Sequence, residues 1–105
     1  MIEGGAPNPR EDEMVNAIVL LTVQRDRIPG VAQELVEVDG VSEVYSVAGR
    51  HDLVAILRAK DDDQLADIVT GHLLKVKGIQ KSETLIAFRV YSKHDLDRLF
   101  SIGMD

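Results

Sequence analysis

The spacing of hydrophobic residues along the first half of the chain changes from a continuous run to a helical period. Residues Ala17–Val23 form a nearly continuous apolar run rich in β-branched side chains, which predicts a strand buried on both faces. Asp26 is the expected cap of the helix that follows, Pro29 suits its first turn, and Asp39-Gly40 ends it. The apolar positions of this helix recur with a period that buries one face: Ile28, Val31, Ala32, Leu35 and Val36.

Two further strand-like runs follow directly. Val41–Ala48 and Leu53–Ala59 are each rich in aliphatic side chains, and they are joined by Gly49-Arg50-His51-Asp52. The short connection and its glycine suit a hairpin, because glycine adopts the backbone conformations that tight turns require. The pattern therefore predicts two antiparallel neighbours.

Helical spacing then returns and gives way to a last strand. The acidic triplet Asp61–Asp63 suits a helix start, where the macrodipole favours negative charge. We expect this second helix to run to Gly78, with His72 on its apolar stripe. Thr84–Tyr91 is the last predicted strand. A short C-terminal helix is indicated by the spacing of Leu96, Leu99 and Phe100.

The order β-α-β-β-α-β predicts an α+β fold of ferredoxin-like type. Right-handed crossovers place both helices on one face of a four-stranded antiparallel sheet. The strands are nonetheless apolar on both faces, since Leu53, Ala55 and Leu57 alternate with Val54 and Ile56. A sheet with one solvated face should alternate apolar with polar residues. We therefore expect a homodimer in which two sheets pack face to face.

Composition limits the class of protein. The 105 residues suit one domain, for which we expect a flexible tail over 1–14, a folded domain over 15–92 and a C-terminal extension over 93–105. The net charge of −6 and the absence of a Lys/Arg cluster argue against direct nucleic-acid binding. There is no cysteine, which excludes disulfides and thiolate sites. No apolar run reaches the roughly 20 residues of a membrane-spanning helix, so we expect a cytoplasmic protein.

Candidate chemistry is sparse. The three histidines form no metal-type pair, and no phosphate loop or serine elbow is present, so we expect no catalytic residue, metal or cofactor. The turn at Gly49–Asp52 is the exception, because the amides of a tight turn suit an anion and Asp52 can accept bonds from an ammonium group. Carboxylate and ammonium together describe a free amino acid. The alternative is that Asp52 bonds the turn's own backbone.

Two stretches resemble a known family. Val41–Leu53 is similar, in its Gly49 and Asp52, to a glycine-aspartate turn of the effector domain of the Lrp/AsnC feast/famine regulators, also called the RAM domain. Lys77–Ile86 is similar to the segment that leads into that domain's last strand. The resemblance covers about three-quarters of the chain, and the order and spacing of the two motifs within a β-α-β-β-α-β pattern make it fairly specific.

The resemblance implies a dimeric α/β sandwich whose dimers associate further, often four in a ring, which is an octamer. Small effectors, typically amino acids, sit where dimers meet. By position, Gly49, Arg50, His51 and Asp52 form the ligand-facing turn with Leu53 beside it, and Ser82 and Thr84 match hydroxyl positions on the last strand. Asp52 takes the amino group and turn amides take the carboxylate.

Two departures from the family pattern set the partners that we expect. Only a short acidic tail precedes the domain, where family regulators carry a helix-turn-helix, so DNA binding is not carried over and full-length regulators of the family are the expected protein partners. His51 stands where an aromatic is frequent, which suggests pH-sensitive binding. Two alternatives remain: a small dimeric α/β-barrel enzyme using His72, and a purely structural assembly partner.

Overall fold

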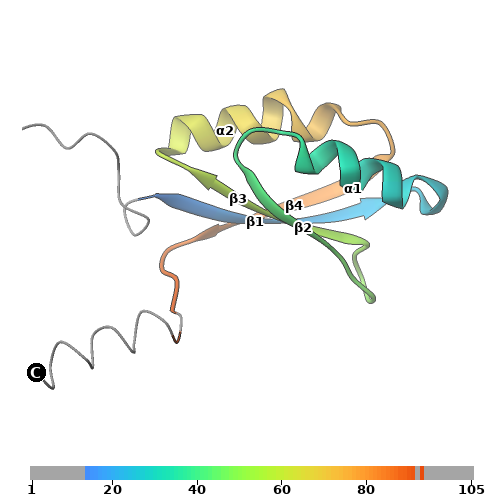
Figure 1. Cartoon of the computed structure of the whole chain (residues 1–105), viewed down its shortest axis with the longest axis horizontal. Helices are drawn as coiled ribbons and strands as arrows, with labels where there is room; N and C mark the ends of the chain where they lie inside the picture. Colours follow the sequence, from blue (N-terminus) through green and yellow to red (C-terminus); the bar gives the residue numbers. More distant parts are fainter. Residues whose placement is uncertain (1–13, 92, 94–105) are drawn as a thin grey trace, which may run out of the picture.

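The computed structural model describes residues 14–91 and 93, in which four strands and two helices alternate in the predicted order. Figure 1 shows both helices on one side of the sheet. The sheet is antiparallel with strand order β2-β3-β1-β4, the ferredoxin-like arrangement. The bounds are β1 Val15–Val23, α1 Ile28–Val36, β2 Val41–Ser46, β3 Leu53–Ala59, α2 Asp62–Gly71 and β4 Ile79–Ala87.

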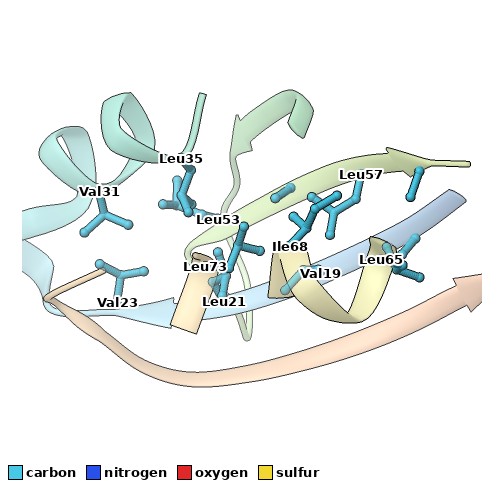
Figure 2. Close-up of a cluster of buried hydrophobic side chains, with 13 residues drawn as sticks. Val19, Leu21, Val23, Val31, Leu35, Leu53, Leu57, Leu65, Ile68 and Leu73 are labelled. Carbon is cyan, nitrogen blue, oxygen red and sulfur yellow. The ribbon is translucent and has the colours of Figure 1, made fainter. Parts of the chain in front are cut away.

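The core lies between the sheet and the two helices, as Figure 2 shows. Alternate residues of β1 and β3 point into it: Ala17, Val19, Leu21, Val23, Leu53, Ala55, Leu57 and Ala59. Val31 and Leu35 of α1 and Leu65 and Ile68 of α2 cover them from the helix side. The side chains of this core are aliphatic throughout the described residues.

The helix ends differ from the sequence prediction. Asp26 does not cap α1: a 3-10 turn at Arg25–Arg27 precedes the helix, and Arg27 takes the N-cap position, where its side chain makes no capping hydrogen bond. Pro29 does lie in the first turn. The second helix ends at Gly71 instead of Gly78, because the chain passes into another 3-10 turn at Leu73–Lys75.

The extent of three strands also differs from prediction. β1 begins at Val15, two residues before the predicted Ala17. β2 stops at Ser46, two residues before the predicted Ala48. β4 covers Ile79–Ala87 instead of Thr84–Tyr91, because it pairs with β1 and the last registered pair is Asn16 with Ala87. The boundaries of β3 are as predicted. Residues 1–13 of the predicted tail and the predicted C-terminal helix lie outside the described residues.

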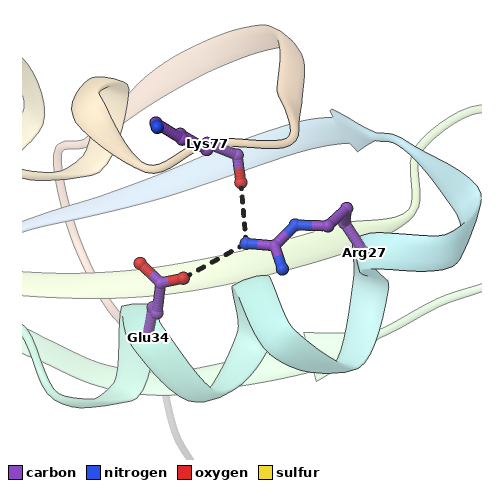
Figure 3. Close-up of polar contacts among 3 residues, drawn as sticks. All are labelled: Arg27, Glu34 and Lys77. Atoms are coloured by element: carbon purple, nitrogen blue, oxygen red, sulfur yellow. Dashed lines mark hydrogen bonds and ion pairs between the residues drawn. The ribbon is translucent and has the colours of Figure 1, made fainter.

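Arg27 links the start of α1 to the connection before β4 (Figure 3). Its Nη2 donates to Oε1 of Glu34 at 3.3 Å and to the carbonyl oxygen of Lys77 at 3.4 Å. The ion pair is largely exposed and therefore contributes little to stability. Gly78 lies close by, with its carbonyl oxygen accepting from Gln24 N–H at 2.8 Å. The two crossover connections are thus joined at one end of the molecule.

The other face of the sheet, which we call the open face, is covered by neither helix. It carries four half-buried aliphatic side chains in its middle, Ile18, Leu20, Val54 and Ile56. By register, Tyr45 of β2 and Leu85 of β4 extend the apolar surface to both edges. The expected apolar character of this face is therefore present in the structure.

Candidate functional site

The turn between β2 and β3 is held by hydrogen bonds at its ends. Val47 N–H donates to the carbonyl oxygen of Asp52 at 3.0 Å, which closes the turn after β2. Asp52 N–H donates to the carbonyl oxygen of Leu21 at 2.8 Å, which extends the pairing of β3 with β1 by one residue. Gly49 has a φ of +133°, and a Cβ there would meet no atom within 4 Å. Conformation, not crowding, therefore favours glycine at this position.

The carboxylate of Asp52 is a second anchor of the turn. Val23 N–H donates to its Oδ2 at 2.8 Å, at the point where β1 ends. No described residue donates to the other oxygen, Oδ1. The sequence alternative, in which Asp52 bonds the turn's own backbone, is therefore replaced by a bond to a neighbouring strand. Because a carboxylate can accept about four hydrogen bonds, this one keeps capacity for a ligand.

The middle of the turn carries backbone N–H donors and a buried imidazole nitrogen. The N–H groups from Ala48 to His51 make no hydrogen bond within the described part of the chain. The side chain of Arg50 is exposed, and that of His51 is half-buried. Nδ1 of His51 is buried without a hydrogen-bond partner among the described residues. Such an atom costs about 1–3 kcal/mol unless a ligand or a second chain supplies a partner.

The other predicted site residues lie at various distances from this turn. Leu53 is fully buried in the core. Ser82 pairs in register with Leu21, so it faces the helix layer one strand beyond β1, and Thr84 pairs with Val19 two residues further along β4. With strands about 4.8 Å apart, the backbone of Ser82 lies roughly 10 Å from that of Asp52. The structure thus brings the turn and Ser82 to the same end of the sheet, with β1 between them.

His72 does not occupy the place that an enzyme would need. It was expected on the apolar stripe of the second helix, but it is exposed at the C-cap of α2. The helix ends one residue earlier, and Leu73 takes the buried position instead. Within residues 14–91 and 93, no group of three or more His, Asp or Glu side chains could hold a metal ion.

A shallow hollow on the surface lies away from the turn. It is formed by the outer side of α1 from Gly30 to Glu37 together with Val44 of β2, and none of the predicted site residues lines it. Its lining combines the apolar side chains of Ala32, Val36 and Val44 with the polar side chains of Gln33, Glu34 and Glu37. None of the helices that the structure describes is long and apolar enough to cross a membrane.

The backbone partners of Asp52 were not predicted from the sequence. Leu21 and Val23 supply a carbonyl oxygen and an N–H, groups that almost any residue provides at a strand end. Only the register between β1 and β3 identifies them. The aspartate itself was found from the spacing of Gly49 and Asp52 around the turn.

The family model for the Lrp/AsnC ligand binding domain matches residues 16–96. This chain belongs to that family. The match covers all four strands except Val15 at the start of β1, both helices and the turn at Gly49–Asp52, and it confirms the family expected from the two sequence motifs. It also agrees with the ferredoxin-like topology.

Relatives of the domain are named as transcriptional regulators. The chain is 30% identical over 84 residues to the HTH-type transcriptional regulator LrpA of Pyrococcus abyssi, an alignment covering 77% of this chain and 60% of that protein. The chain therefore spans less than two-thirds of the length of this curated relative. Its similarity to LrpA supports a regulatory role for the domain.

Solved structures share the fold. Protein TTHA0845 from Thermus thermophilus superimposes with a TM-score of 0.70 at 40% identity, covering 75% of this chain and 99% of that chain. A Neisseria meningitidis transcriptional regulator, solved as an L-Met complex, gives a TM-score of 0.70 at 14% identity, covering 87% and 62% of the two chains. At that identity the second match speaks for the fold alone.

Proposed function

We propose that this chain is a non-enzymatic sensing module that binds a free amino acid or a similar small effector at the turn Gly49–Asp52. The carboxylate of Asp52 carries the proposal: β1 holds it through Oδ2, and Oδ1 is left to accept from an ammonium group. The N–H groups from Ala48 to His51 are the donors for the effector's carboxylate. Nδ1 of His51 gains a hydrogen-bond partner when the site is filled.

The effector-binding test separates the two roles of Asp52. In Asp52→Asn the carboxamide oxygen still accepts from Val23 N–H, so the fold is kept, but the negative charge is lost. We expect one or more of the twenty amino acids to raise the melting temperature of the wild type, and Asp52→Asn to bind it at least about tenfold more weakly. The matched control is Asp26→Asn, which removes an equal charge from an exposed position and should bind like the wild type.

Two results would contradict effector binding at this turn. The first is that no amino acid changes the melting temperature of the wild type. The second is equal affinity of wild type and Asp52→Asn measured by calorimetry. Asp52→Ala adds a check on the anchor: leaving Val23 N–H unpaired should lower the free energy of unfolding by about 1–3 kcal/mol without any ligand present.

The sensing module acts as a homodimer in which the open faces of two sheets pack together. Support comes from the aliphatic centre of that face, because burying apolar surface contributes a favourable free energy of about 25 cal/mol per Å².

Sedimentation tests this arrangement. It should show a dimer for the wild type and a monomer for Ile56→Lys, which places a charge at the centre of the face. Val36→Lys is the control, since Val36 is an exposed apolar residue on α1, on the other side of the molecule. A wild-type monomer, or a dimer that survives Ile56→Lys, would overturn this arrangement.

The dimers assemble further, with effectors at their junctions, and the module regulates transcription or amino-acid metabolism by mixing with full-length Lrp/AsnC regulators. The family and the regulator named LrpA support this role. Native mass spectrometry of this chain mixed with a purified full-length regulator of the family should show mixed oligomers. Two separate homo-oligomer populations after co-refolding would contradict it. Octamer formation and a cytoplasmic location stay predictions.

A further inference from the structure

The segment that follows β4, Phe88–Tyr91, carries large apolar side chains that nothing in the described chain covers. Phe88 is 97% exposed, Tyr91 79% and Val90 57%. Pairing with β1 ends at Asn16 and Ala87, so the chain leaves the sheet after that residue. Figure 1 shows it turning away from the sheet on the side opposite the helices, which is the side of the open face.

The placement of aromatic rings in this molecule is uneven. Within the described residues the aromatics are Tyr45, Phe88 and Tyr91, and all three are exposed, whereas the core is wholly aliphatic. Tyr45 lies on the open face opposite Val54, and the other two lie on the segment that projects beyond that face. Aromatic side chains are enriched at the energetic centres of protein interfaces because each buries a large area at a small cost in side-chain freedom.

We propose that Phe88–Tyr91 is an arm that clasps the second copy of this chain, with Phe88 and Tyr91 buried against the rim of the partner's open face. The proposal rests on the face-to-face dimer proposed above. The arm adjoins the open face, and for this reason we assign it to the same partner: a second copy that covers the open face must also contact the arm that projects past it. In a two-fold dimer each copy contributes one arm, so every arm contact occurs twice.

The test measures dimer dissociation by sedimentation across a range of concentrations, using the full chain. Phe88→Ser and Tyr91→Ser should each raise the dissociation constant at least about tenfold, and more together, because each dimer loses both copies of the contact. Leu74→Ser is the matched control: Leu74 is also an exposed large apolar residue, but it lies in the 3-10 turn after α2, on the helix layer. Its dissociation constant should equal that of the wild type.

A second readout follows the arm itself. The chain has no tryptophan, so Phe88→Trp introduces a single reporter. Its emission should lie at shorter wavelength in the dimer, and should move to longer wavelength when Ile56→Lys is added to separate the subunits. Emission typical of water-exposed tryptophan in both variants would overturn the arm.

Failure of the arm and failure of the dimer give different results. If Ile56→Lys dissociates the dimer while Phe88→Ser and Tyr91→Ser leave its dissociation constant unchanged, the arm is wrong and the dimer stands. If the wild type is a monomer at every concentration, both are wrong. Circular dichroism of each variant confirms that the monomer fold is intact, since none of the substituted arm residues contributes to the core.

Discussion

Gly40 and Gly71 show how much one missing side chain can matter at one position and how little at another. Gly40 ends the connection from α1 with a φ of +97°, and a Cβ there would collide with Cδ1 of Ile68, a core residue of α2. Gly71 is the last residue of α2, and nothing lies within 4 Å of where its Cβ would be. Left-handed backbone and steric overlap coincide only at the first position.

We therefore predict opposite effects for the same substitution at these two glycines. Gly40→Ala should lower the free energy of unfolding by about 2 kcal/mol or more, from backbone strain and displacement of Ile68. Gly71→Ala should leave it unchanged or raise it by up to about 1 kcal/mol, since alanine favours helix and restricts the unfolded chain. Urea unfolding of both variants measures this, and equal losses would contradict the proposed role of Gly40.

A second prediction at this scale concerns Tyr45. Its hydroxyl donates to Oε2 of Glu43 at 3.0 Å, and this bond, aided by the negative charge of Glu43, raises the pKa of Tyr45 above its ordinary value of 10.0. Because the folded pKa is raised, the associated stabilisation is present below the unfolded pKa and is lost as pH rises through the folded value.

The chain has two tyrosines, so Tyr91→Phe leaves Tyr45 as the one that titrates. In that background, ultraviolet absorbance should give a phenol pKa above 10.0, and Glu43→Gln should lower it. Burial in the proposed dimer should raise this pKa further, because burial disfavours the charged phenolate. A pKa that does not respond to Glu43→Gln would show that the hydrogen bond is absent in solution.

At the scale of elements, the two helix starts separate what sequence could predict from what it could not. Both have an aspartate near the start, but only Asp61 caps: its Oδ1 accepts from Gln64 N–H at 2.8 Å, and Oε1 of Gln64 accepts from Lys60 N–H at 2.7 Å. Asp26 falls inside the 3-10 turn before α1. Side-chain type identifies candidates for a cap, whereas the local backbone path decides which one serves.

The substitution Asp61→Ala should accordingly cost about 1 kcal/mol of unfolding free energy, the usual value of an N-cap. Asp26→Ala should stay within about 0.5 kcal/mol of the wild type, because that side chain is exposed and caps no helix. Urea midpoints measured side by side test the pair. A larger loss at Asp26 than at Asp61 would reverse the assignment.

Strand β4 was the least predictable element for a related physical reason. Its first half, Gln80-Lys81-Ser82-Glu83, is polar because an edge strand has fewer neighbours, so the sequence there lacks an apolar signal. The residues after it, Phe88–Tyr91, are apolar apart from Arg89 and were predicted as strand, although they lie beyond the last pair with β1. A run of apolar residues indicates burial, but it does not tell whether the residues are buried within their own chain or against another one. In the arm proposed above, they are buried against another chain.

At the scale of the whole molecule, the topology and family were predictable because they depend on the order of elements and on two motifs. The effector turn was predictable only in part. Gly49 and Asp52 were identified from their spacing, but the bond from Val23 to Asp52 depends on the register of β1 and β3. The sequence positions of the turn and of Ser82 do not indicate that strand β1 lies between them in the sheet.

The last prediction also concerns the whole molecule: the stability of the fold should depend on dimer formation. If folding buries the open face only when two copies associate, the dimer is favoured by mass action, and raising the protein concentration about a hundredfold should stabilise it by about 2.7 kcal/mol. The melting temperature of the wild type should therefore rise with concentration, while that of Ile56→Lys, whose new charge lies in the middle of that face, should stay constant. Scanning calorimetry over that range provides the measurement, with Val36→Lys as the control that should follow the wild type. A wild-type melting temperature independent of concentration would mean that the open face faces water in the native protein, and the effector site would then have to be complete within one copy.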